Sequence, residues 1–251
     1  MIFIFALILA LITPITFANG LWLDRIEDGK RGRVIPVELT LPVQPEQCQA
    51  NNKCPVVLLS AGYGMAHNQY SFLATWFSQQ GYLSVAVGHE LVGDPPLSVT
   101  GKLYKTRSEN WIRGAETLDV VRTQLSGQLS NYNFDELLLV GHSNGGDISA
   151  WRIKQSTQHI SGIITLDHRR VPLPRNSDIK TLSIRASDFA ADQGVLPTRD
   201  EQLRDGSCVI TIADAKHNDM WDGGAEQLKA DIIAIIKAFL RATPCQQIAS
   251  R

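Results

Sequence analysis

Hydrophobic and polar positions follow two patterns along this chain, one typical of strands and the other typical of helices. Short continuous apolar runs at 55–60 and 83–87 are typical of strands covered on both faces. Longer stretches with apolar residues three or four positions apart predict amphipathic helices. These helices are expected at 68–80, 111–125, 144–155 and 225–240. Further short apolar runs predict strands at 137–140, 163–166, 182–184 and 209–212.

The alternation of strands and helices predicts an α/β fold with a mostly parallel sheet and helices on both faces. Residues 31–42 alternate polar and apolar positions, which favours an edge strand or hairpin before the parallel strands. The connection 166–180 is too short for a cap domain, so an active site would lie open at the carboxyl ends of the strands. The sequence contains no internal repeat and no shift in composition, so we expect residues 19–251 to form a single domain.

The first eighteen residues have the pattern of a signal peptide. Met1 to Phe17 contain no charged residue, and an apolar stretch at 2–12 is followed by Pro14. Thr16 and Ala18 then place small residues at the −3 and −1 positions of a cleavage site. An uncleaved membrane anchor is the alternative, although the apolar run is short for a spanning helix. We therefore expect a secreted or periplasmic protein without a stable membrane span after cleavage.

Export affects how the four cysteines are interpreted. An even number of cysteines in an exported chain indicates two disulfides, and we favour the pairs Cys48–Cys54 and Cys208–Cys245. Three pairings are possible in principle. Four free thiols in a cytosolic protein are the alternative.

The net charge of the chain bears only on which classes of binding partner can be excluded. The chain has a formal net charge of −1, and no long basic or acidic run interrupts it. This balance argues against a nucleic acid or an anionic surface as the partner.

The candidate chemistry is concentrated at LLLVGHSNGG, residues 137–146. Ser143 lies between Gly141 and Gly145, after a buried strand and before a helix, which is the setting that a G-x-S-x-G nucleophile turn requires. Glycines two positions before and after the serine avoid collisions in a strained turn. The backbone N–H of Asn144, at the start of the helix, is placed to stabilise an oxyanion. A chance match is the alternative interpretation.

A nucleophilic serine needs a base, and the base needs an orienting acid. His217 follows the last strand, from which its loop can reach Ser143. For the acid we favour Asp188, in the loop after the strand at 182–184. Asp192 in the same loop and Asp167 at the end of the preceding strand are the alternatives.

The second oxyanion donor should come from the loop Ala61-Gly62-Tyr63-Gly64, which follows the strand at 55–60. We choose the N–H of Tyr63, with Gly62 or Gly64 as alternatives. Three histidines near strand ends are candidates for lining the pocket: His67, His89 and His168. None belongs to an H-x-H or H-E-x-x-H pair, so we predict no metal.

With these residues the chain resembles the α/β-hydrolase fold family from about residue 31 to residue 240. The resemblance is carried by VVLLSAGYG, WIRGAETLDVVRTQL, LLLVGHSNGG, SIRASD and AKHNDM. Together with RGRVIPVELTLP and the uncapped layout, it looks most like the secreted dienelactone-hydrolase or platelet-activating-factor-acetylhydrolase-like branch. The chain departs from that branch in two places. Ala61-Gly62 replaces a common His-Gly, and Ser143 stands where dienelactone hydrolases have cysteine.

The resemblance implies a serine carboxylic-ester hydrolase that forms an acyl-enzyme on Ser143, uses no cofactor and acts on a small-molecule or lipid-like ester. An acyltransferase or peptidase with the same triad is one alternative. A non-catalytic binding module with this fold is another, although Ser, Asp and His are all present in the expected order.

Overall fold

The computed structural model describes residues 23–249, which form one eight-stranded sheet with helices packed on it. The strands are β1 (Arg25–Asp28), β2 (Arg33–Thr40), β3 (Cys54–Ser60), β4 (Leu83–Val87), β5 (Tyr132–His142), β6 (Ile160–Leu166), β7 (Lys180–Arg185) and β8 (Cys208–Thr211). The α-helices are α1 (Ser71–Gln79), α2 (Leu103–Thr106), α3 (Ser108–Gln128), α4 (Asn144–Gln155), α5 (Arg199–Asp205), α6 (Glu226–Leu240) and α7 (Cys245–Ala249). Two short 3₁₀ helices, η1 (Pro45–Gln47) and η2 (His217–Asp219), complete the set.

The sheet has the order β1-β2-β4-β3-β5-β6-β7-β8. β1 and β2 form an antiparallel hairpin, and β2 runs antiparallel to β4. All later neighbours are parallel, as expected where helices connect the strands. The carboxyl ends of β3, β5, β6, β7 and β8 therefore meet at one edge of the sheet, the edge at which ligands bind in such folds.

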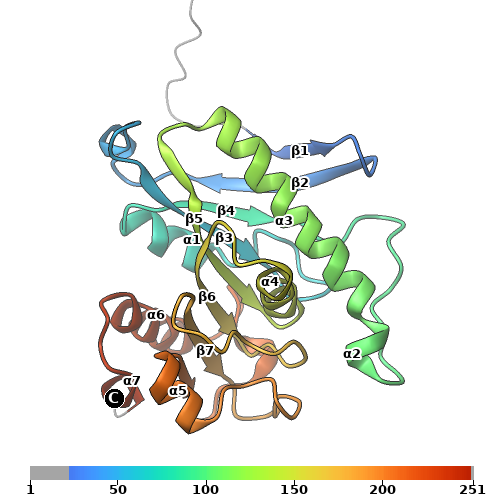
Figure 1. The fold of residues 1–251 in the computed structure, drawn as a ribbon, viewed down its shortest axis with the longest axis vertical. Coiled ribbons are helices and arrows are strands. Elements are labelled where there is room, and N and C mark those ends of the chain that lie inside the picture. The colour runs from blue at the N-terminus through green and yellow to red at the C-terminus, as the bar shows by residue number, and fades with distance from the viewer. Residues whose placement is uncertain (1–22, 250–251) are drawn as a thin grey trace, which may run out of the picture.

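Two apolar cores lie on opposite faces of this sheet. Along β3, Val56 and Leu58 belong to the core under α3 and α4, whereas Val57 and Leu59 belong to the core under α1 and α6. Figure 1 shows α3 and α4 together over one face of the sheet. Successive strand side chains point to opposite faces, so a continuous apolar run supplies both cores at once. This explains why the central strands contain so few polar residues.

The structure confirms the predicted fold class and the predicted elements. The helix at 144–155 and the strand at 83–87 have the predicted bounds, and most other elements extend a few residues further. The edge segment at 31–42 is the second strand of the β1–β2 hairpin. Between β6 and β7, residues 167–179 contain neither helix nor strand, in agreement with the absence of a cap domain in this connection.

Several short elements were not predicted from the sequence: the strand β1, the helices α2, α5 and α7, and the two 3₁₀ helices. For α5 a local signal was present. Thr198 and Glu201 form a reciprocal capping box, and Gly206 ends the helix in the left-handed conformation. A seven-residue helix offers too few apolar positions for its period to be recognised.

The predicted signal peptide, residues 1–18, lies outside the described residues. Within residues 23–249, no helix is both long enough and apolar enough to cross a bilayer.

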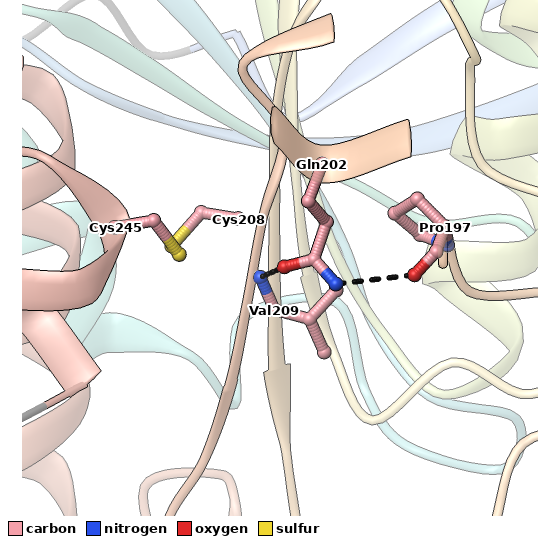
Figure 2. The surroundings of a disulfide bond; sticks show 5 residues. All are labelled: Pro197, Gln202, Cys208, Val209 and Cys245. Atoms are coloured by element: carbon pink, nitrogen blue, oxygen red, sulfur yellow. Dashed lines mark hydrogen bonds between the residues drawn. A yellow bond between two sulfur atoms is a disulfide. The ribbon is translucent and has the colours of Figure 1, made fainter. Parts of the chain in front are cut away.

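Both predicted disulfides are present in the structure. Cys48, in the loop before β3, is bonded to Cys54 at the start of that strand. Cys208 at the start of β8 is bonded to Cys245 at the start of α7 (Figure 2). Near the second bond, the Gln202 side chain accepts a hydrogen bond from Val209 N at 3.2 Å and donates one to Pro197 O at 3.1 Å. The edge strand β8 is thus tied to α5 by a side chain and to α7 by a covalent bond.

We expect the two disulfides to contribute unequally to stability. They close chains separated by 37 and 6 residues, for which loop-closure entropy corresponds to about 4 kcal/mol and about 2 kcal/mol respectively. The double variant Cys208→Ala/Cys245→Ala should therefore unfold at a lower urea concentration than Cys48→Ala/Cys54→Ala. Equilibrium urea unfolding of the two variants and the parent checks this order. A larger loss from the Cys48–Cys54 pair would contradict it.

Candidate active site

The turn between β5 and α4 holds Ser143 in a strained conformation. Its φ is 52° and its ψ is −120°, a region that residues other than glycine rarely adopt. A Cβ on Gly141 would lie 2.4 Å from the carbonyl carbon of Gly145. A Cβ on Gly145 would lie 2.2 Å from the backbone oxygen of Ser60, at the end of β3. The turn thus needs both glycines, because backbone from three segments meets there.

Backbone hydrogen bonds fix Ser143 at the carboxyl edge of the sheet. Its N–H donates to Leu166 O at 2.8 Å, and its carbonyl accepts from Asp147 N in the first turn of α4 at 3.1 Å. Ser143 is partly exposed, whereas His142 and Asn144 on either side are buried. The strained turn therefore leaves Ser143 partly exposed between two buried neighbours.

The imidazole ring of His217 contacts the carboxylate of Asp167, and not that of Asp188 as we expected. The distance between His217 Nδ1 and Asp167 Oδ2 is 2.5 Å. Asp188 is exposed, and its Oδ1 accepts a hydrogen bond from the backbone N–H of His217 at 2.8 Å. The structure therefore does not place Asp188 at the imidazole ring, and the carboxylate of Asp188 holds the backbone of the His217 loop instead.

Asp192, the second alternative, also lies away from the ring. Its side chain forms an ion pair with Arg170. Of the three candidate acids, only Asp167 contacts the imidazole.

The sheet explains why Asp167 is the partner. β6 lies next to β5, with His142 paired to Leu166, so Asp167 leaves β6 beside the turn of Ser143. Its φ of 48° marks an abrupt change of direction at the end of the strand. Asp188 follows the end of β7, one strand further from β5.

The side chain of Asp167 is fully buried and has three partners. Arg185 Nη2 lies 2.6 Å from its Oδ1, Ala186 N donates to the same oxygen at 3.2 Å, and His217 contacts Oδ2. Burial alone would raise the pKa of Asp167, but the hydrogen bond with His217 and the charge of Arg185 outweigh it and lower the pKa below its usual value. The carboxylate is ionised and can only accept, so His217 Nδ1 carries the proton.

The opposite side of the imidazole faces a cation. Arg169 Nη2 lies 3.5 Å from His217 Nε2, a long contact in which the guanidinium can only donate. The same guanidinium lies over the ring of Phe189, 4.5 Å from its centroid, and Phe189 is 49% exposed. A hydrogen bond from Arg169 would use the lone pair of Nε2, the same lone pair that a general base requires. Neither Arg169 nor Arg185 was predicted from the sequence as a site residue.

Asn144 begins α4, where the first N–H groups have no acceptor within the helix. Its side chain is fixed by two hydrogen bonds: Trp111 Nε1 donates to Oδ1 at 2.9 Å, and Nδ2 donates to Asn110 Oδ1 at 2.8 Å. Nδ2 also lies 3.4 Å from the carboxyl of Glu90, whose pKa is raised to about 7 by burial. This packing holds the backbone of Asn144 in place beside Ser143.

The loop after β3 approaches the same edge. Gly62 is buried, whereas Tyr63 is exposed and its hydroxyl accepts a hydrogen bond from Leu97 N at 3.0 Å. The N–H of Gly62 donates to the hydroxyl of Tyr70 at 3.2 Å, so it already has an acceptor. This leaves Tyr63 preferred over Gly62 as the second oxyanion donor, and its role stays a prediction.

Two of the three candidate pocket histidines line a hollow beside this loop. The hollow has a volume of about 260 Å³, and its wall includes His67, His89 and Glu90. His168 does not line it: its ring is fully buried and its Nε2 donates to Val171 O at 3.1 Å. Burial lowers the pKa of both His89 and His168 to about 3, so both are neutral. Across residues 23–249, no group of three or more His, Cys, Asp or Glu side chains is arranged to hold a metal ion.

Solved structures resemble this chain along most of its length. An esterase from Thermogutta terrifontis with butyrate bound is 10% identical, with 86% of this chain and 92% of that chain covered at a TM-score of 0.63. A protein assigned as a dienelactone hydrolase from Klebsiella pneumoniae subsp. pneumoniae is 15% identical, with 86% and 97% covered at a TM-score of 0.59. A ferulic acid esterase from Streptomyces cinnamoneus is 18% identical, with 79% and 68% covered at a TM-score of 0.54.

Other comparisons are more limited. The chain spans 41% of the length of an epoxide hydrolase mutant from Vigna radiata, at a TM-score of 0.42. No family model matches the sequence, and neither does any curated protein sequence. The three longer likenesses cover most of this chain and agree with it in fold. The protein has the α/β-hydrolase fold.

Proposed function

We propose that the protein is a serine hydrolase that cleaves carboxylic esters through an acyl-enzyme on Ser143. The observation that carries the proposal is the contact of His217 with the buried, ionised Asp167, beside a serine held in a strained turn. A histidine oriented by a carboxylate, with its other nitrogen unprotonated, is the arrangement that activates a serine hydroxyl. The named activities of the structural neighbours suggest an ester substrate, which is small or lipid-like.

In the proposed reaction, Ser143 Oγ attacks the ester carbonyl carbon while His217 Nε2 accepts the hydroxyl proton. The imidazolium formed is stabilised by Asp167, and the N–H groups of Asn144 and Tyr63 stabilise the oxyanion. Collapse breaks the bond to the alcohol, which leaves with the proton from His217. Water then attacks the acyl group as His217 accepts its proton. Collapse of this second intermediate releases the carboxylic acid while His217 returns the proton to Ser143 Oγ. No cofactor takes part in these steps.

Arg169 places one requirement on this scheme. Its guanidinium lies at the nitrogen that must receive the proton, and its charge opposes formation of an imidazolium. The contact between Arg169 and His217 must therefore break before Nε2 can accept the proton of Ser143. The charge of Asp167 on the other side of the ring favours the imidazolium and opposes this effect.

An organophosphonate should label Ser143, because an activated serine reacts at phosphorus as it does at a carbonyl. We expect a fluorophosphonate probe to modify the purified mature protein, with the adduct located on Ser143 by peptide mass spectrometry. His217→Ala should reduce the labelling rate by at least about 100-fold, and Ser143→Ala should abolish labelling and esterase activity. A folded protein without an adduct would instead favour the non-catalytic binding module. Products formed with added alcohol or amine acceptors separate hydrolysis from acyl transfer.

The two carboxylates near His217 should differ sharply in their effect. Asp167→Asn removes the charge beside Nδ1 and lets the amide favour the wrong tautomer, so kcat on p-nitrophenyl butyrate should fall by about 10²- to 10⁴-fold. Asp188→Asn keeps an oxygen for the backbone N–H of His217, and kcat should fall by less than about 5-fold. Steady-state kinetics of both variants test this difference. A greater loss in Asp188→Asn would restore Asp188 as the catalytic acid.

A further inference from the structure

We propose that Tyr70 is a positioning residue, whose hydroxyl couples the oxyanion loop to the loop of the base through His142. The inference rests on the proposed function, since it concerns the alignment of the same site. Three consecutive hydrogen bonds form the chain. Gly62 N lies 3.2 Å from Tyr70 Oη, Tyr70 Oη lies 2.6 Å from His142 Nδ1, and His142 Nε2 lies 3.0 Å from His217 O.

Donors and acceptors permit only one direction for this chain. A backbone N–H can only donate and a carbonyl can only accept, so Gly62 is the first donor and His217 the last acceptor. His142 Nε2 must therefore carry a proton and donate to His217 O. Burial lowers the pKa of His142 to about 3, so the ring is neutral and Nδ1 is an acceptor. The hydroxyl of Tyr70 donates to Nδ1 and uses a lone pair to accept from Gly62.

The chain connects the three segments that the proposed reaction must align. Gly62 precedes Tyr63, the expected second oxyanion donor, and His142 precedes Ser143. At the other end, the carbonyl that accepts from His142 belongs to His217 itself. The imidazole rings of His142 and His217 are also in contact, with centroids 4.9 Å apart. One hydroxyl thus contributes to the placement of the oxyanion donor, the nucleophile and the base.

Burial makes the chain rigid. Tyr70 is 4% exposed and His142 is 5% exposed, so water cannot readily replace a lost partner. Without the Tyr70 hydroxyl, Gly62 N–H and His142 Nδ1 would both lose their partners. His142 could then change tautomer, which would replace the donor to His217 O by an acceptor and repel that carbonyl.

Tyr70→Phe tests the coupling, and Tyr82→Phe is the matched control. Tyr82 packs against Phe77 in the same core, and its hydroxyl has no hydrogen-bond partner within residues 23–249. At a temperature where both variants are fully folded, Tyr70→Phe should lower kcat on p-nitrophenyl butyrate by about 10- to 100-fold while KM changes less than about 2-fold. Tyr82→Phe should leave both constants within about 2-fold of the parent.

A spectroscopic measurement tests the positioning without relying on turnover. In ¹H–¹⁵N spectra of the histidine rings, the parent should show His142 protonated at Nε2, and Tyr70→Phe should show a mixed or reversed tautomer. The proposal is overturned if Tyr70→Phe keeps parental kcat, or if the His142 tautomer is the same in both proteins. Loss of thermal stability with unchanged kcat also overturns it, because that result is a structural role only.

Two substitutions of His142 cover the case in which Tyr70→Phe does not fold. The amide of glutamine reaches the Nε2 position and can still donate to His217 O, whereas that of asparagine reaches only the Nδ1 position. His142→Gln should therefore retain at least about 5-fold more activity than His142→Asn. Equal activity in the two variants overturns the proposal.

If the parent neither hydrolyses esters nor reacts with a fluorophosphonate, the proposed function fails, and the tautomer comparison alone decides whether Tyr70 positions His142.

Discussion

The close approach of backbone at the serine turn is the constraint on which the rest of the candidate site depends. Gly145 packs against the end of β3, Gly141 packs against Gly145, and a Cβ on Gly146 would lie 2.7 Å from His168 Cβ. Three strand ends and the start of α4 are thereby brought into one small volume. Because Ser143 N donates to Leu166 O, the position of Asp167, the next residue along the chain, follows from the same packing. The turn therefore sets the positions of both Ser143, the proposed nucleophile, and Asp167, the proposed acid.

A buried charge organises the other half of the site. Removing a carboxylate from water is costly unless charged or hydrogen-bonding partners replace the water. Asp167 meets this condition through Arg185 and His217, and the fixed carboxylate in turn selects the tautomer of the imidazole. His217 lies between this anion and the guanidinium of Arg169. The ring that acts as the base in the proposed reaction thus lies between two opposite charges, one buried and the other partly exposed.

The choice between Asp167 and Asp188 shows where inference from the sequence stopped. Both follow predicted strands, and spacing along the chain does not reveal which carboxylate turns toward the imidazole. A further signal was available in Arg185, a charged residue that ends the apolar run at 182–184. A buried arginine requires an anion nearby, and Asp167 ends the neighbouring strand. That the carboxylate of Asp188 would contact the backbone of His217 instead could not be inferred, because it depends on the path of an exposed loop.

The sequence by itself determined the order of the main strands and helices, the serine turn and the loop of His217, and it favoured the cysteine pairs that the structure contains. These features are encoded locally, by hydrophobic period, by glycine at positions that exclude a side chain, and by spacing along the chain. Only the tertiary structure decided which carboxylate faces His217, that Arg169 lies at its free nitrogen, and that Tyr70 and His142 connect the two loops. Such contacts join residues that are distant in sequence, for example Asp167 and His217, and their geometry arises only when the strand ends meet at one edge of the sheet.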